Sequence, residues 1–161
     1  RRSSMKSSVA LLFVLVVGCI PSRGEQVHTR KVDEEWLQKK PLSLAVLDIH
    51  TNENPIDPVF LQMNLAQALR ELGYSETRSQ AYQRPQKPWK NREAAGVAQQ
   101  TGHDAALVLA FHNEEGLLQA SLRVIDTSGT IRYDVQLELS AEGLTGEDLI
   151  LKLLSPLERI L

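Results

Sequence analysis

Residues 105–139, AALVLAFHNEEGLLQASLRVIDTSGTIRYDVQLEL, contain two kinds of predicted β-strand in succession. The run AALVLAF is apolar without interruption, which is typical of a strand that is buried on both faces of a sheet. From Leu118 to Leu139, apolar and polar residues alternate in two segments, which predicts antiparallel strands with one solvated face. The intervening DTSG predicts a hairpin turn in which Gly129 takes a positive φ angle. The stretch therefore predicts a sheet that changes from parallel to antiparallel pairing.

The preceding sequence predicts another buried strand, a helix and an edge strand. Residues 42–49, LSLAVLDI, form a second continuous apolar run. Asp57 followed by Pro58 is a typical helix start, with an N-cap acceptor and a proline in the first turn. Residues 74–82 predict a short polar strand at the edge of the sheet. The apolar face of the predicted helix comprises Leu61, Leu65, Leu69 and Leu72.

Two further helices complete the predicted fold. Asn91 is expected to cap a helix of small residues that ends at Gly102, and small side chains allow a helix to lie close to a sheet. Thr145 and Asp148 resemble a capping box at the start of a last helix, which Pro156 should kink or split. The predicted order is β-α-β-α-β-β-β-α. It corresponds to an α/β (α+β) domain over residues 41–161, with helices packed on a mixed sheet.

The amino-terminal residues predict a secreted precursor. Residues 9–17 form an apolar run that is too short to span a bilayer but has the length of a signal-peptide core, so residues 1–18 are interpreted as a signal peptide. The sequence Val16-Val17-Gly18-Cys19 resembles the bacterial lipobox. That resemblance implies that diacylglycerol is attached to the Cys19 sulfur, that the preceding peptide is removed, and that further acylation, for example by palmitate, follows. The alternative is a cysteine buried as a small hydrophobic residue in a membrane anchor.

Residues 19–40 are predicted to be a lipidated cysteine and a polar tether, because they are too polar to bury much apolar surface. Within this segment, Val32, Trp36 and Leu37 lie near helical spacing, which allows a short helix. Ile20 follows the cysteine, and in Gram-negative lipoproteins the absence of aspartate there implies the outer membrane; the Gram type of the host stays open. Residues 1–4 precede the first methionine and are either an upstream artefact or a degenerate twin-arginine signal.

The composition of the chain excludes several classes of function. Its formal net charge is −2 and aromatic residues make up 5%, which argues against a nucleic-acid partner. The single cysteine excludes an internal disulfide framework and a multi-cysteine metal site. No nucleophile elbow, Walker loop or dinucleotide-binding glycine motif is present, and no cofactor is predicted.

One metal or acid–base site is an alternative interpretation. Asp48 and His50 follow the first apolar strand, and His112 follows the central one. Ligand sites cluster beyond the carboxyl ends of parallel strands, so these three side chains could meet. Imidazole and carboxylate groups are metal ligands and proton carriers. Polar residues solvated at strand ends are the simpler interpretation, because no metal-binding spacing supports the site.

A binding surface for a partner protein is the favoured interpretation. Tyr82, Arg84 and Trp89 lie in or after the predicted polar edge strand, and an unpaired strand edge can accept a strand from another chain. Trp89 has a second interpretation as a side chain that covers an edge of the core. A homo-oligomer is also left open.

Four segments of the chain resemble a group of bacterial envelope domains: LAVLDI, LAQALRELGY, GHDAALVLAF and SLRVIDTSGTIRYDVQLEL, within residues 42–139. The group comprises the amino-terminal domain of the Tol-Pal translocation protein, the curli-secretion lipoprotein and lipoprotein activators of penicillin-binding proteins. The resemblance implies a non-enzymatic scaffold, activator or interaction module that is anchored to the outer membrane and faces the periplasm. It does not imply which partner is bound.

Overall fold

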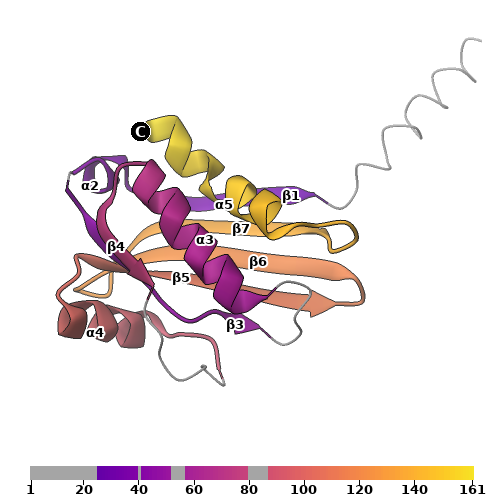
Figure 1. Ribbon diagram of the computed structural model, residues 1–161, viewed down its shortest axis with the longest axis horizontal. Helices are drawn as coiled ribbons and strands as arrows, with labels where there is room; N and C mark the ends of the chain where they lie inside the picture. Colours follow the sequence, from indigo (N-terminus) through magenta and orange to yellow (C-terminus); the bar gives the residue numbers. More distant parts are fainter. Residues whose placement is uncertain (1–24, 40, 52–56, 80–86) are drawn as a thin grey trace, which may run out of the picture.

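The computed structural model describes residues 25–39, 41–51, 57–79 and 87–161, which form one mixed sheet with helices on both faces (Figure 1). The strands are β1 (Gln26–Val32), β2 (Ser43–Val46), β3 (His50–Thr51), β4 (Ser75–Ser79), β5 (Ala105–Glu114), β6 (Leu117–Asp126) and β7 (Ile131–Ser140). The helices are α2 (Glu34–Leu37), α3 (Pro58–Glu71), α4 (Asn91–Thr101) and α5 (Gly146–Ile160).

The strand order is β1-β7-β6-β5-β2-β4, and β3 pairs with β5 next to β2. β4, β2 and β5 run parallel, whereas β5, β6, β7 and β1 are antiparallel. This arrangement confirms the predicted mixed sheet and the element order from residue 41 onward. The predicted strand over residues 42–49 is divided into β2 and β3, and both pair with β5.

The predicted tether is partly wrong, because the sheet begins before residue 41. Gln26–Val32 forms β1, an edge strand that pairs antiparallel with β7. An edge strand needs few buried side chains, since backbone hydrogen bonds to one neighbour hold it in place. β1 is therefore almost entirely exposed and its sequence resembles a linker. The short helix allowed near Trp36 is confirmed as α2, whose buried residue is Leu37.

Helices cover both faces of the sheet (Figure 1). Each face has its own hydrophobic core. α3 covers one face with the leucine stripe predicted from the sequence, including Leu65, and α5 covers it with leucines such as Leu153. The Tyr133 hydroxyl of β7 donates a 2.6 Å hydrogen bond to the Leu153 carbonyl and ties α5 to the sheet. α4 covers only part of the opposite face with alanines and Val97, so the polar half of the antiparallel sheet stays open.

The helix starts mostly follow the predicted capping. Asp57 accepts a 3.0 Å hydrogen bond from the Val59 amide, and Thr145 accepts one of 3.2 Å from the Asp148 amide. Lys90, rather than Asn91, is the N-cap of α4, because the Asn91 side chain is hydrogen-bonded to Arg123.

Pro156 lies inside one continuous helix, so the prediction that it could split α5 is wrong. Leu153 and Leu157, on either side of the proline, are both buried against the sheet, and this packing holds the two halves of the helix together. No helix in the described part of the chain has the length and hydrophobicity to cross a membrane.

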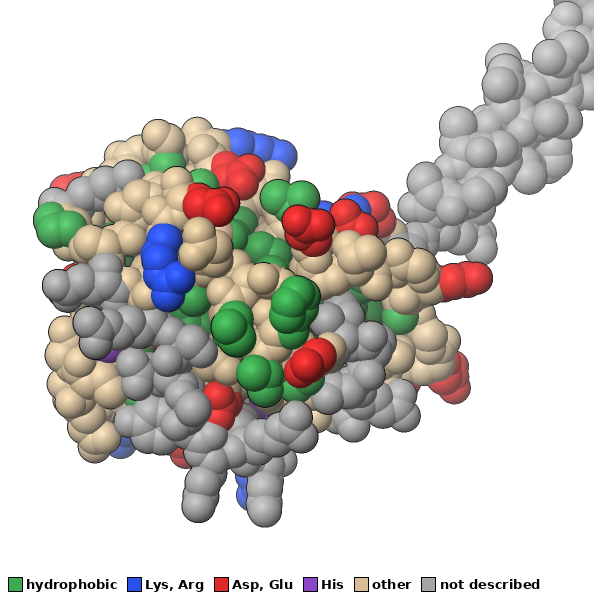
Figure 2. Space-filling model, in the orientation of Figure 1, with side chains coloured by type: hydrophobic (Ala, Val, Ile, Leu, Met, Phe, Trp, Pro, Cys, Tyr) green, Lys and Arg blue, Asp and Glu red, His purple; other side chains and the backbone are tan. Residues whose placement is uncertain are grey.

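The outer face of α3 and α5 exposes apolar side chains (Figure 2). Val59, Phe60 and Met63 on α3 and Leu151 on α5 are each more than half exposed. They point away from the core that the same two helices form with the sheet. This surface is distinct from the open sheet face on which α4 lies.

Candidate functional site: the open face of the sheet

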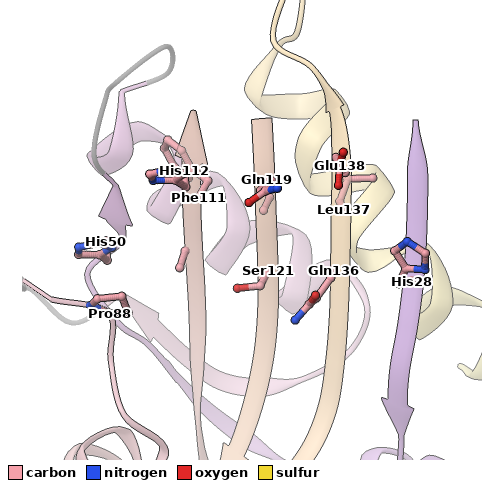
Figure 3. Close-up of a pocket in the computed structure, with 12 residues that line it drawn as sticks. His28, His50, Pro88, Phe111, His112, Gln119, Ser121, Gln136, Leu137 and Glu138 are labelled. Carbon is pink, nitrogen blue, oxygen red and sulfur yellow. The ribbon is translucent and has the colours of Figure 1, made fainter. Parts of the chain in front are cut away.

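A pocket of about 440 Å³ lies on the face of the sheet that α4 leaves open (Figure 3). Seven of its twelve lining residues carry side chains that can form hydrogen bonds: three imidazoles, two amides, a hydroxyl and one carboxylate. The lining residues are His28, His50, Pro88, Ala110, Phe111, His112, Gln119, Ala120, Ser121, Gln136, Leu137 and Glu138. The pocket is therefore suited to a polar ligand or a polar segment of another chain.

Strand register brings these side chains together. His50 of β3 pairs with Ala110, which pairs with Ser121 of β6, and the same row continues through Gln136 to His28 of β1. Every second residue of a strand points to the same face, so a parallel row begins two residues further along. That second row contains His112, Gln119 and Glu138. The alternation predicted for the two hairpin strands thus creates the polar floor of the pocket.

The structure brings His50 and His112 into one pocket, as the metal-site interpretation requires. Asp48 is not among the residues that line it; its backbone carbonyl accepts a 2.8 Å hydrogen bond from the Trp89 indole. The His112 imidazole lies 3.8 Å from the Glu114 carboxylate, and both side chains are largely exposed. Within the described ranges, no three histidine, cysteine, aspartate or glutamate side chains come close enough to hold a metal ion.

Trp89 fastens the segment before α4 to the edge of the pocket. Its indole N–H donates to the Asp48 carbonyl, and its own carbonyl accepts a 2.9 Å hydrogen bond from Arg123. Its ring packs against the core beneath α4. This position agrees with the interpretation of Trp89 as a cover for an edge of the core. Tyr82 and Arg84, the other predicted partner-binding residues, lie outside the described residues.

Two half-buried residues of opposite charge lie next to the polar rows of the pocket. Arg123 of β6 and Asp134 of β7 are direct cross-strand partners. Burial lowers the pKa of the Arg123 guanidinium, although the charge of Asp134 opposes this effect. Burial also raises the pKa of the Asp134 carboxyl, against the effect of Arg123 and Arg30. The hydrogen bonds of Arg123 go to Asn91 and to the Trp89 carbonyl, so this side chain connects β6 to α4 and to the segment before it.

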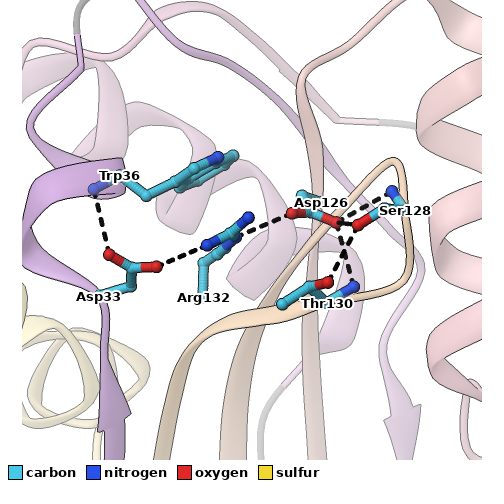
Figure 4. A network of polar contacts seen from close by, with 6 residues as sticks. All are labelled: Asp33, Trp36, Asp126, Ser128, Thr130 and Arg132. Atoms are coloured by element: carbon cyan, nitrogen blue, oxygen red, sulfur yellow. Dashed lines mark hydrogen bonds and ion pairs between the residues drawn. The ribbon is translucent and has the colours of Figure 1, made fainter.

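A second polar cluster joins β1 and α2 to the hairpin of β6 and β7 (Figure 4). The Arg132 guanidinium contacts Asp33 at 2.6 Å and Asp126 at 2.8 Å, and it lies 5.5 Å from the centroid of the Trp36 ring. Hydrogen bonds from the Arg132 side chain and the Trp36 amide lower the pKa of the Asp33 carboxyl. This cluster holds β1, the edge strand that the sequence did not predict, against the rest of the sheet. Asp33 is a typical N-cap residue and directly precedes EEWL, so it is the signal in the sequence that could have identified α2.

Sequence reasoning did not identify His28, Gln136 and Glu138 as pocket residues. The sequence places His28 in the predicted tether, and it places Gln136 and Glu138 at polar positions of an alternating strand. The alternation of polar and apolar residues in β7 indicated that Gln136 and Glu138 lie on the solvated face of the sheet. The position of His28 beside them depends on the pairing of β1 with β7, which the polar composition of β1 did not indicate.

The solved structures that match this chain have low sequence identity to it. A PelC dodecamer structure from Paraburkholderia phytofirmans matches with a TM-score of 0.60 and 17% identity, over 83% of this chain and 97% of that one. The LpoB C-terminal domain from Salmonella enterica matches with a TM-score of 0.48 and 16% identity, over 68% and 93% of the two chains. TolB from Acinetobacter baumannii matches with a TM-score of 0.48 and 12% identity, over 83% of this chain and 31% of TolB.

No protein-family model matches the chain, and no curated protein matches it. The likeness to PelC extends over nearly the whole of that protein and shows that the two chains share a fold. This chain is thus similar in fold to PelC.

Proposed function

We propose that this chain is a lipid-anchored protein of the bacterial envelope, and that its domain acts by binding other proteins rather than by catalysis. The observation that carries the proposal is Val16-Val17-Gly18-Cys19, directly after an apolar run of signal-peptide length. Cys19 lies outside the described residues, and its lipidation is inferred from the sequence. The proposed location is the outer membrane, with the domain facing the periplasm.

Self-association is the first form of binding that we propose. The PelC structure that shares this fold is a dodecamer. Two strand edges of the present sheet, β1 and β4, each pair with one neighbour among the described residues, so each leaves backbone groups that another chain could pair with. Such an assembly would act as a scaffold or activator that binds an envelope protein as its second partner.

The docking surface proposed for the second partner is the β4 edge with Tyr82, Arg84 and Trp89. β4 has a polar sequence and lies at the end of the strand order, which suits pairing with a strand from another protein. A photo-crosslinking amino acid placed at position 82 or 84 of the full chain in cells should give a defined adduct with one envelope protein or with a second copy. A lack of adducts at both positions would contradict this surface.

The lipid anchor is tested by measuring the intact mass of the protein purified from bacterial membranes. The wild-type mature chain should begin at Cys19 and carry the added mass of a diacylglycerol and a fatty acyl chain. Cys19→Ser removes the sulfur, so the variant should retain the residues before position 19 and carry no lipid. A mature wild-type chain without lipid mass at Cys19 would overturn the proposal.

A further inference from the structure

Four exposed apolar side chains form a patch on the outer face of two neighbouring helices (Figure 2). Val59, Phe60 and Met63 follow one another along the first turns of α3, and Phe60 lines the same groove as Leu151 of α5. Phe60 and Met63 are each 60% exposed. Single exposed apolar residues are common, but a contiguous group of this kind indicates a contact surface. We refer to these four residues as the helix patch.

The helix patch lies close to the point where the chain leaves the domain toward Cys19. Lys152, the residue after Leu151, forms an ion pair with Glu25, the first described residue before β1. Six peptide units separate Cys19 from Glu25, and six extended residues span at most about 20 Å. A lipid chain on Cys19 would therefore hold the middle of α5, around Lys152, within a short distance of the bilayer surface.

We infer that the helix patch enters the interfacial layer of a lipid bilayer and gives the domain a second membrane contact beside its lipid anchor. The inference rests on the proposed lipidation of Cys19. Apolar faces of helices bind in this way by burying phenylalanine, leucine and similar side chains at the boundary between headgroups and acyl chains. The contact would fix the orientation of the domain, because an anchor alone lets it rotate.

The charges around the helix patch specify the kind of lipid surface. Glu71 and Glu147 line the groove beside Phe60 and Leu151, and the ammonium group of Lys152 is already paired with Glu25. An anionic membrane surface repels carboxylates, so the patch is suited to zwitterionic lipids. The partner is therefore a bilayer surface rich in phosphatidylethanolamine rather than one rich in anionic lipid.

Spin labelling of the full lipidated chain tests this contact. Cys19 is the only cysteine, and its sulfur is blocked when it carries lipid, so Met63→Cys and Leu151→Cys each introduce one reactive site. Gln119→Cys, on the open face of the sheet, is the matched control because Gln119 is also exposed. The labelled proteins are bound to vesicles of phosphatidylethanolamine and phosphatidylcholine. Collision of the nitroxide with oxygen and with a water-soluble nickel complex is then measured.

Labels at positions 63 and 151 should collide more with oxygen and less with nickel when vesicles are added, whereas the label at 119 should not change. Water-like collision rates at 63 and 151 in the bound protein would overturn the inference. Immobile labels shielded from both reagents would also overturn it, because they would show that protein covers the patch.

The number of nitroxide labels per chain shows whether Cys19 carries lipid, so the anchor proposal and this inference can fail separately. Each variant contains Cys19 and one introduced cysteine, so a second label would show that Cys19 is free and that the anchor proposal has failed. If that unlipidated chain still binds vesicles through positions 63 and 151, the helix patch is a membrane contact by itself. If it does not bind vesicles, the inference is overturned together with the anchor.

Discussion

The Asp126 carboxylate organises the turn between β6 and β7. It accepts hydrogen bonds from the Ser128 amide at 2.9 Å, the Ser128 hydroxyl at 2.6 Å, the Thr130 amide at 3.0 Å and Arg132 at 2.8 Å. Gly129 has a φ angle of 86°, which confirms the predicted positive φ. One buried side chain therefore accepts hydrogen bonds from the donors of the turn and also connects the turn to Arg132. Arg132 in turn contacts Asp33 at the start of α2.

Replacement of this carboxylate should make stability less dependent on pH. Burial alone would raise the pKa of Asp126, but the hydrogen bonds from Ser128, Arg132 and Thr130 outweigh that effect and lower the pKa. The carboxylate therefore stabilises the fold above the ordinary aspartate pKa of about 4, and this contribution is lost as the pH falls through the lowered value. Asp126→Asn should reduce the free energy of unfolding by about 2 kcal/mol at neutral pH.

The difference between Asp126→Asn and the wild type should shrink when chemical denaturation is repeated at about pH 3, below the ordinary pKa of the group. Glu142→Gln, in the exposed segment before α5, is the matched control and should change the free energy of unfolding by less than about 0.5 kcal/mol. A difference for Asp126→Asn that stays constant between the two pH values would contradict the assigned role of its charge.

At the scale of elements, α4 shows how side-chain size positions a helix. Ala94, Ala95 and Ala98 are buried against β2, β5 and β6, where larger side chains would hold the helix away from the sheet. Gly96 lies on the same helix, but a methyl group at its Cα would meet no atom within 4 Å. Close packing against the sheet therefore explains the alanines of α4, whereas packing does not require a small residue at Gly96.

Two substitutions in α4 should therefore act in opposite directions. Gly96→Ala should raise the free energy of unfolding by about 0.5–1 kcal/mol, because alanine loses less backbone entropy in a helix. Ala98→Leu should lower it by about 1–3 kcal/mol through overpacking. Urea denaturation of both variants measures the two effects. If Ala98→Leu were as stable as the wild type, the close contact between α4 and the sheet would be wrong.

At the scale of the whole molecule, the sheet is most strongly held at its centre. β5 and β6 each have a neighbouring strand on both sides and contribute to both hydrophobic cores. β1 and β4 lie at the two ends of the strand order. Local opening of an edge strand breaks fewer contacts than opening of a central strand, so the stability of this domain is graded across the sheet.

Hydrogen exchange of the full chain should reproduce this gradient. At low protein concentration, amides of β1 should exchange at least about tenfold faster than those of β5, because an edge strand opens without global unfolding. Mass spectrometry of peptic fragments measures both strands in one sample. Equal protection of β1 and β5 would contradict the prediction and would indicate that a second chain covers the β1 edge.

Residues 42–161 were predictable because their elements have local signals. The apolar run of β5, the alternation in β6 and β7, and the caps at Asp57 and Thr145 each depend on neighbouring residues only. The candidate site was predictable in part for the same reason. His50 and His112 follow apolar runs, so their position near the carboxyl ends of parallel strands could be inferred.

The sequence by itself determined the element order from residue 41 onward, the two faces of the antiparallel strands and the lipobox-like motif at Cys19. Only the tertiary structure decided that Gln26–Val32 is a strand, that His28 and Glu138 share a pocket with His50, and that α5 continues through Pro156. The physical reason is the range of the interactions. Helix caps and burial patterns act between near neighbours, whereas edge pairing and strand register depend on backbone groups about a hundred residues apart, as between His28 and Gln136.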